Sequence, residues 1–144
     1  MNYLILLCPV ISIILGSLWF GPLFGKRYRA YCGMTPEMEK AILSDPVQKA
    51  SMNKMMMKSM ILAFFSSLLL AFSLSGAITA GKLIYGVTGI YAALLIPFFN
   101  WLGFVVPPTL GMVLWENKKW GHWFLVSGFW LVYMCLCGLL LVFL

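Results

Sequence analysis

The stretch WFLVSGFWLVYMCLCGLLLVFL, residues 123–144, decides the fold because it has no charged side chain and is long enough to cross a bilayer. At about 1.5 Å per residue, roughly 20 helical residues span a hydrocarbon core of about 30 Å. In that solvent the chain must pair every backbone polar group internally, which favours an α-helix. We therefore expect residues 123–144 to form a membrane-spanning helix.

Three further apolar runs have the same character, at about residues 3–20, 59–80 and 84–115. The third is too long for one straight helix across the bilayer, and Pro97 and Pro107-Pro108 interrupt it. The sequence thus predicts an all-α protein, an integral membrane four-helix bundle whose third helix is kinked or broken at prolines. Residues 1–144 form a single domain of four spans.

Composition supports this class. Of the 144 residues 62% are hydrophobic and 10% are charged, a ratio that a soluble domain of this length does not tolerate. The formal net charge is +6, but the basic residues flank apolar runs and form no stripe with base-stacking aromatics. We therefore expect no nucleic-acid partner, and assign the charge to anchoring against anionic lipid.

The polar segment 26–58 carries two helix starts. Thr35-Pro36-Glu37 is an N-cap followed by proline and an acid in the first turn, and Asp45-Pro46 repeats that logic. The second helix should lead without a break into the span at 59–80, with a turn at Gly81-Lys82. Methionines at 52, 56 and 60 then share one face of an amphipathic lead-in, either as interfacial packing or as a partner groove.

The loops predict the topology. With four spans, segments 26–58 and 115–121 share a side and hold nine of the ten basic residues, and Lys82 is on the other side. Basic loops face the cytoplasm, so both termini should lie outside it. We expect a multi-pass protein of the inner (plasma) membrane with a cytoplasmic segment 26–58.

Small residues indicate how the helices pack. Close backbone approach and polar contacts drive helix association in lipid. We expect a small-residue stripe on the second span to meet one on the third, with a homodimer seam as the alternative. The first stripe is Ser67, Ala71, Ser75 and Thr79, and the second is Gly103, Pro107 and Gly111.

Polar residues within the spans are few. None of the spans holds a deep ionisable group, which argues against a proton-coupled transporter. Asn100 is the most polar deep residue, and it either bonds carbonyls freed by a proline kink or helps to bind a ligand. A ligand site in the bundle would be lined by Asn100, Trp101 and Trp130.

Two other groups of side chains could carry chemistry. Glu116 and His122 could form an acid–base pair or half of a metal site, although one histidine is weak evidence for a metal. Cys8 and Cys137 fall at similar depth, and with Met134 they could bind Cu(I) or form a disulfide, or act as small apolar fillers. We expect no metal, no cofactor and no catalytic residue.

Two stretches carry a family resemblance. One is Trp19-Phe20-Gly21-Pro22-Leu23-Phe24-Gly25-Lys26 followed by Gly33-Met34-Thr35-Pro36-Glu37-Met38; the other is Trp101-Leu102-Gly103-Phe104-Val105, Pro108, Glu116, Lys119-Trp120 and Phe124-Leu125-Val126. Together they resemble the bacterial membrane family catalogued as domain of unknown function 1761. Phe20 and Tyr28 depart from the Tyr and Trp expected there, but keep aromatic character.

The resemblance implies a four-helix membrane protein of this size and no particular activity. It marks as motif positions Trp19, Gly21, Pro22, Gly25, Lys26, Trp101, Gly103, Phe104, Glu116 and Trp120. Turn-formers and interface aromatics of this kind suit a maintained shape at the cytoplasmic face more than a reaction centre.

The leading functional hypothesis is a non-catalytic accessory subunit or homo-oligomer that acts through helix–helix contacts, alone or in a larger membrane complex. One alternative is a transporter or membrane enzyme that binds an apolar small molecule near Asn100. Another is a binder of lipid headgroups at the cytoplasmic face, through segment 26–58 and Lys118-Lys119.

Overall fold

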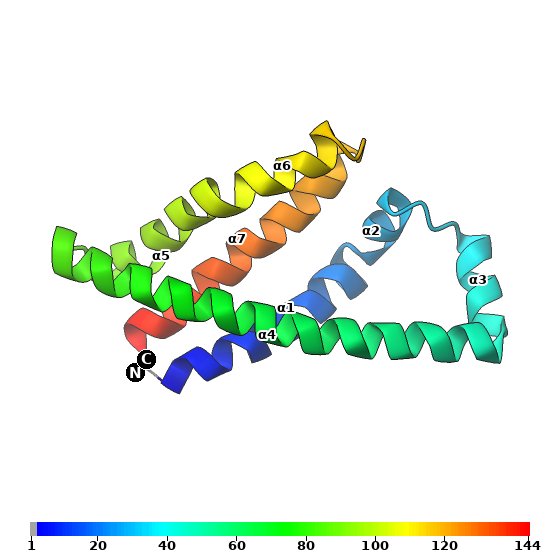
Figure 1. Ribbon diagram of the computed structural model, residues 1–144, viewed down its shortest axis with the longest axis horizontal. Coiled ribbons are helices and arrows are strands. Elements are labelled where there is room, and N and C mark those ends of the chain that lie inside the picture. The colour runs from blue at the N-terminus through cyan, green and yellow to red at the C-terminus, as the bar shows by residue number, and fades with distance from the viewer. Residues whose placement is uncertain (1–2) are drawn as a thin grey trace.

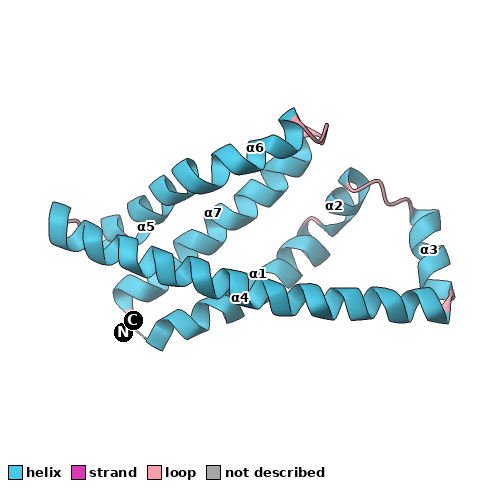
Figure 2. Cartoon of the chain, viewed as in Figure 1, coloured by secondary structure: helices cyan, strands magenta, loops and turns pink. Residues whose placement is uncertain are grey.

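The computed structural model describes residues 3–144, and helices account for nearly all of them (Figures 1 and 2). Four helical stretches are long and apolar enough to cross a membrane: Tyr3–Leu23, Pro46–Tyr85, Gly89–Leu114 and Trp120–Phe143. The first, second and fourth extend beyond the spans expected from the sequence, because helical geometry continues into the polar flanks, whereas Gly89–Leu114 lies within the expected 84–115. The described chain is therefore all-α, as expected.

The first stretch has three parts. A 3-10 turn, η1 (Tyr3–Leu7), leads into α1 (Cys8–Leu18) and then into a π-helical segment, η2 (Trp19–Leu23). Gly21 leaves helical geometry there, at φ −100° and ψ −105°, directly before Pro22. The chain then turns into the short α2 (Gly25–Tyr31).

Both helix starts in the polar segment are confirmed. The hydroxyl of Thr35 accepts a hydrogen bond from the Met38 amide (3.3 Å) at the start of α3 (Pro36–Ser44). The Asp45 carboxylate accepts one from the Val47 amide (2.9 Å) at the start of α4 (Pro46–Tyr85). From there α4 runs unbroken into the apolar region, as the sequence suggested.

The turn predicted at Gly81 and Lys82 is wrong. Helix α4 continues through them to Tyr85 and ends at Gly86, whose φ of 65° is the left-handed geometry of a helix C-cap. Gly81 is buried because Ile96 packs over it, and a β-carbon there would lie 2.6 Å from the Ile96 Cδ1 atom. Its small size therefore serves packing and not a turn.

The third apolar run is helical throughout. It consists of α5 (Gly89–Asn100), a π-helical segment η3 (Trp101–Val105) and α6 (Val106–Leu114). Pro97 lies inside α5, and Pro107 and Pro108 lie in the first turn of α6, directly after the π-helical segment. The π-helical turn therefore separates the two proline sites.

The fourth helix, α7 (Trp120–Phe143), lies at the centre of the structure and packs against α1, α4, α5 and α6. Its Tyr133 is fully buried, and the phenol donates a hydrogen bond to the Ser67 carbonyl on α4 (3.0 Å). The core around Tyr133 draws on η1, α1, α4 and α7, with Cys8, Ala71, Leu74 and Cys137 among its members.

The most extensive contact joins α5 to α7, side by side in Figure 1. Pro97 has no amide hydrogen to give the Ala93 carbonyl one turn earlier. Gly138 lies directly on that carbonyl: a β-carbon there would overlap the Ala93 oxygen and lie 2.6 Å from Pro97 Cγ. A glycine is therefore required where the two helices cross.

The two small-residue stripes do not meet. Ser67 and Ala71 are fully buried in the core between α4 and α7. A β-carbon at Gly103 would have no atom within 4 Å, and one at Gly111 would touch only its own Trp115. The expectation that these stripes pair is wrong, because α5 instead contacts α4 and α7 at Gly81 and Gly138.

The elements gather at two ends (Figure 1). The start of η1, the end of α7 and the α4–α5 turn lie at one end, and α2, α3 and the α6–α7 connection lie toward the other. Nine of the ten basic residues therefore lie in α2, in α3, in the half of α4 next to α3 or in the α6–α7 connection, and Lys82 alone lies near the α4–α5 turn.

We predict that Gly138→Ala destabilises the protein by about 1–3 kcal/mol, the usual cost of overpacking, because the new methyl group would meet backbone. Gly76→Ala is the matched control, since a β-carbon there meets nothing within 4 Å. Thermal unfolding in detergent measures both. An unchanged midpoint for Gly138→Ala alongside an unchanged control would contradict the close approach.

Candidate functional site

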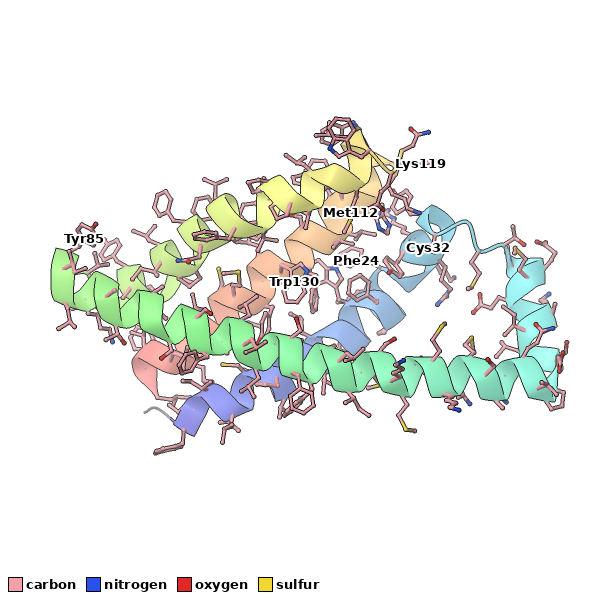
Figure 3. The ribbon with its side chains drawn as sticks, in the orientation of Figure 1. Phe24, Cys32, Tyr85, Met112, Lys119 and Trp130 are labelled. Atoms are coloured by element: carbon pink, nitrogen blue, oxygen red, sulfur yellow. The ribbon has the colours of Figure 1, made fainter. Side chains whose placement is uncertain are left out.

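The candidate site is a pocket between α1, α4 and α7, at the corner where α1 turns into α2. It has a volume of about 550 Å³. In Figure 3, Trp130 on α7 and Phe24 next to α2 lie toward this region. We call it the wedge pocket; its lining residues are Ser12, Ile13, Gly16, Ser17, Phe20, Gly21, Tyr28, Met56, Ser59, Met60, Ala63, Phe129 and Trp130.

Backbone geometry at the α1–α2 corner shapes one end of the pocket. The Phe20 carbonyl passes so close to Gly25 that a β-carbon there would lie 2.6 Å from the oxygen. Gly21 supplies the non-helical turn. The two motif glycines thus allow the sharp corner that brings Phe20 and Tyr28 together, with ring centroids 4.7 Å apart.

Trp19 fastens this corner to α7. Its indole donates a hydrogen bond to the Leu125 carbonyl (3.1 Å), and its ring packs against Phe24 at 4.8 Å between centroids. Gly128 on α7 lies beside the indole, since a β-carbon there would be in ordinary contact with the ring at 3.6 Å. A tryptophan suits this position because its indole N–H can donate a hydrogen bond while its ring packs against apolar side chains.

The lining is apolar with a few hydroxyl groups. Three serines, at 12, 17 and 59, and Tyr28 provide all its side-chain oxygens, and it contains no carboxylate, imidazole, thiol or amine. Burial, aided by the nearby Cys32, raises the pKa of the Tyr28 hydroxyl. Tyr28 is therefore neutral at physiological pH and able to donate a hydrogen bond.

Basic residues occur in two helices that line the pocket. On α2, Lys26 and Arg27 precede the lining residue Tyr28, and on α4, Lys54 and Lys58 lie close in the chain to Met56 and Ser59. All four are exposed, and none of them lines the pocket. Because helical residues two apart point to nearly opposite sides, Lys54 and Lys58 lie on the face of α4 away from Met56.

An ion pair ties the polar segment together. The Arg29 guanidinium on α2 lies 3.4 Å from the Glu39 carboxylate on α3, with both side chains part-exposed. Pairs of this exposure contribute at most about 1 kcal/mol each. The ion pair links α2 to α3, and α3 in turn connects to the N-terminal end of α4 (Figure 1).

His122 connects α2 to α7 but does not line the wedge pocket. Its imidazole stacks on Tyr28 (5.5 Å between centroids) and meets Tyr31 edge-on (6.5 Å). The side chain is 7% exposed, and its Nδ1 atom is buried without a hydrogen-bond partner. Glu116, its predicted acid–base partner, is exposed in the α6–α7 connection.

The structure separates the residues proposed to line one ligand site. The Asn100 amide donates to the Ile96 carbonyl of its own helix (2.8 Å), and the residue borders a different pocket of about 350 Å³ between α4 and α5. The Trp101 indole donates to the Ser127 carbonyl (2.8 Å) on α7. Of these three residues only Trp130 lines the wedge pocket, so they do not form one site.

The helix-packing and motif residues divide between core and surface. Ser67 and Ala71 are buried, Ser75 is half-buried and Thr79 exposed, while Gly103 and Gly111 face away from the core. Trp19, Gly21, Pro22, Gly25 and Lys26 build the corner beside the pocket. Phe104 and Trp120, by contrast, are 77% and 55% exposed.

Sequence reasoning missed most of the pocket. Ser12, Ser17 and Phe129 were not singled out, although the methionine face at 56 and 60 was noted as a possible groove. Two serines within one apolar helix were the available signal. Their meeting with α4 and α7 depends on how the helices cross, which the sequence does not show.

These features define an all-α protein with four helices apolar enough to cross a membrane, and with an apolar pocket at the corner of its first helix. The chain belongs to the family described as "Protein of unknown function (DUF1761)", whose model matches residues 3–142. The resemblance seen in the sequence is thereby confirmed. No curated protein and no solved structure matches the chain.

Proposed function

We propose that the protein is a non-catalytic four-helix bundle of the bacterial inner membrane that holds an anionic lipid in the wedge pocket. The observation that carries this is an apolar pocket of about 550 Å³ lined in part by α2 and α4, two helices whose exposed residues include Lys26, Arg27, Lys54 and Lys58. The third helix would bend at its prolines, and both termini would lie outside the cytoplasm.

The pocket suits the apolar part of such a lipid. Ligand pockets of roughly 300–1,000 Å³ are mostly apolar with a few polar groups that fix orientation. Here Phe20, Phe129 and Trp130 supply apolar walls, and the hydroxyls of Ser12 and Tyr28 are available to ester or glycerol oxygens. Methionines at 56 and 60 adapt readily to a flexible chain.

The surrounding charge suits the headgroup. Basic residues beside a membrane surface attract anionic lipid by about 1 kcal/mol each. Lys26 and Arg27 on α2, and Lys54 and Lys58 on α4, could reach a phosphate placed above the pocket. The lining has no residue suited to acid–base or nucleophilic chemistry at neutral pH, which supports binding without catalysis.

Replacing Lys26, Lys54 and Lys58 together by glutamine should weaken binding of phosphatidylglycerol at least tenfold, because three favourable charge contacts are lost. Native mass spectrometry in mild detergent, with phosphatidylcholine as the neutral competitor, measures retention. The control is Lys118→Gln with Lys119→Gln, which removes charge away from the pocket. Equal retention of both lipids by the wild type, or an equal loss in the control, would refute the proposal.

A second candidate is a homo-oligomer, alone or within a larger membrane complex. The observation that favours it is the pair of small residues Gly103 and Gly111, where an added β-carbon would meet no other helix. Faces of this kind let helices from two chains approach closely in lipid. The same face would then serve as the seam of a symmetric dimer.

For this second candidate we predict a dimer in mild detergent that Gly103→Leu converts to monomer, because a large side chain would separate the two seams. Size-exclusion chromatography with light scattering reports the mass. Gly76→Leu introduces the same bulk at an open position of α4 and should leave the dimer intact. A wild-type protein that is monomeric at all concentrations would exclude this role.

A further inference from the structure

Two of the four cysteines lie in the core, and neither lines the wedge pocket. Cys8 at the start of α1 and Cys137 on α7 are both 0% exposed and belong to the same core cluster. The other two are placed differently: Cys32 is exposed and Cys135 half-buried. Shared burial in one cluster therefore distinguishes this pair from the other two thiols.

The apolar surroundings of Cys8 and Cys137 favour a neutral disulfide over a charged metal complex. Tyr133, Ala71 and Leu74 belong to the same core cluster, and the Tyr133 phenol is already bonded to the Ser67 carbonyl. Within residues 3–144, no cluster of three Cys, His, Asp or Glu side chains is available to a metal ion. Cu(I) between two thiolates would leave a net negative charge in this apolar core, whereas a disulfide is neutral.

A pocket lies near the pair, at the end of the molecule that holds η1 and the last turn of α7. Ile5 and Leu141, each about one helical turn from its cysteine, line this pocket of about 640 Å³. Ser75, Thr79 and Lys82 also line it. Neither cysteine lines the pocket, so an oxidant held there reaches the sulfur atoms only when the side chains of that one turn move aside.

We propose that Cys8 and Cys137 form a redox modification site that is oxidised to an intramolecular disulfide. The two S–H bonds break and one S–S bond forms. The two protons and two electrons pass to a small lipid-soluble quinone, which becomes the quinol. The bond closes a loop of most of the chain and fastens α1 to α7, which restricts the unfolded state.

The experiment counts reactive thiols in the variant Cys32→Ser/Cys135→Ser, which keeps only the pair. Protein in membranes is treated with a lipid-soluble, fully methyl-substituted benzoquinone, which has no free ring position for a thiol to add to, or with carrier solvent. It is then denatured in SDS and labelled with maleimide-polyethylene glycol. We expect two labels without oxidant, none after oxidation, and two again once a reductant is added. Cys8→Ala and Cys137→Ala, added singly to this background, should each retain one label after oxidation.

Three results would overturn the proposal. Two labels after oxidation would show that the pair does not react. An oxidised species of twice the mass would show a bond between chains. Protection present before oxidant, and removed by a Cu(I) chelator, would show a metal site in its place.

Discussion

The structure depends on one constraint, which is that a backbone in hydrocarbon has no water to complete its hydrogen bonds. The four apolar stretches satisfy this constraint because they are helical almost from end to end, even across Gly81 and the π-helical turn at residues 101–105. Where Pro97 removes a donor, Gly138 of α7 presses its backbone against the Ala93 carbonyl. The tightest helix contact thus lies where the helical ladder is interrupted.

The same constraint shapes the corner between α1 and α2. Ending a helix at a membrane boundary exposes carbonyls, and here a π-helical turn, a glycine and a tryptophan organise the exit. Trp19 fixes the corner to α7, and α4 diverges from it toward α3 (Figure 1). The wedge pocket arises from that divergence, and the helices on either side of α3 that help to line it, α2 and α4, carry exposed basic residues.

The sequence predicted those features that local chemistry controls. Apolar runs of sufficient length predicted the helices, and the capping side chains of Thr35 and Asp45 predicted two helix starts. Features that depend on helix rotation were not predictable. Gly81 suggests a turn in the sequence, but in the structure Ile96 packs against it. Asn100 and Trp130 were expected to line one site but line different pockets. The predicted pairing of the two small-residue stripes was wrong for the same reason, because it depends on how each helix is rotated about its axis.

The central claim is that the four helices cross the membrane with segment 26–58 inside the cell. A variant without native cysteines, carrying either Lys49→Cys or Lys82→Cys, tests it with a membrane-impermeant maleimide. The account predicts that intact spheroplasts label only Lys82→Cys and that inverted vesicles label only Lys49→Cys. Labelling of Lys49→Cys in intact spheroplasts would contradict the orientation and, with it, the placement of the wedge pocket at the inner leaflet.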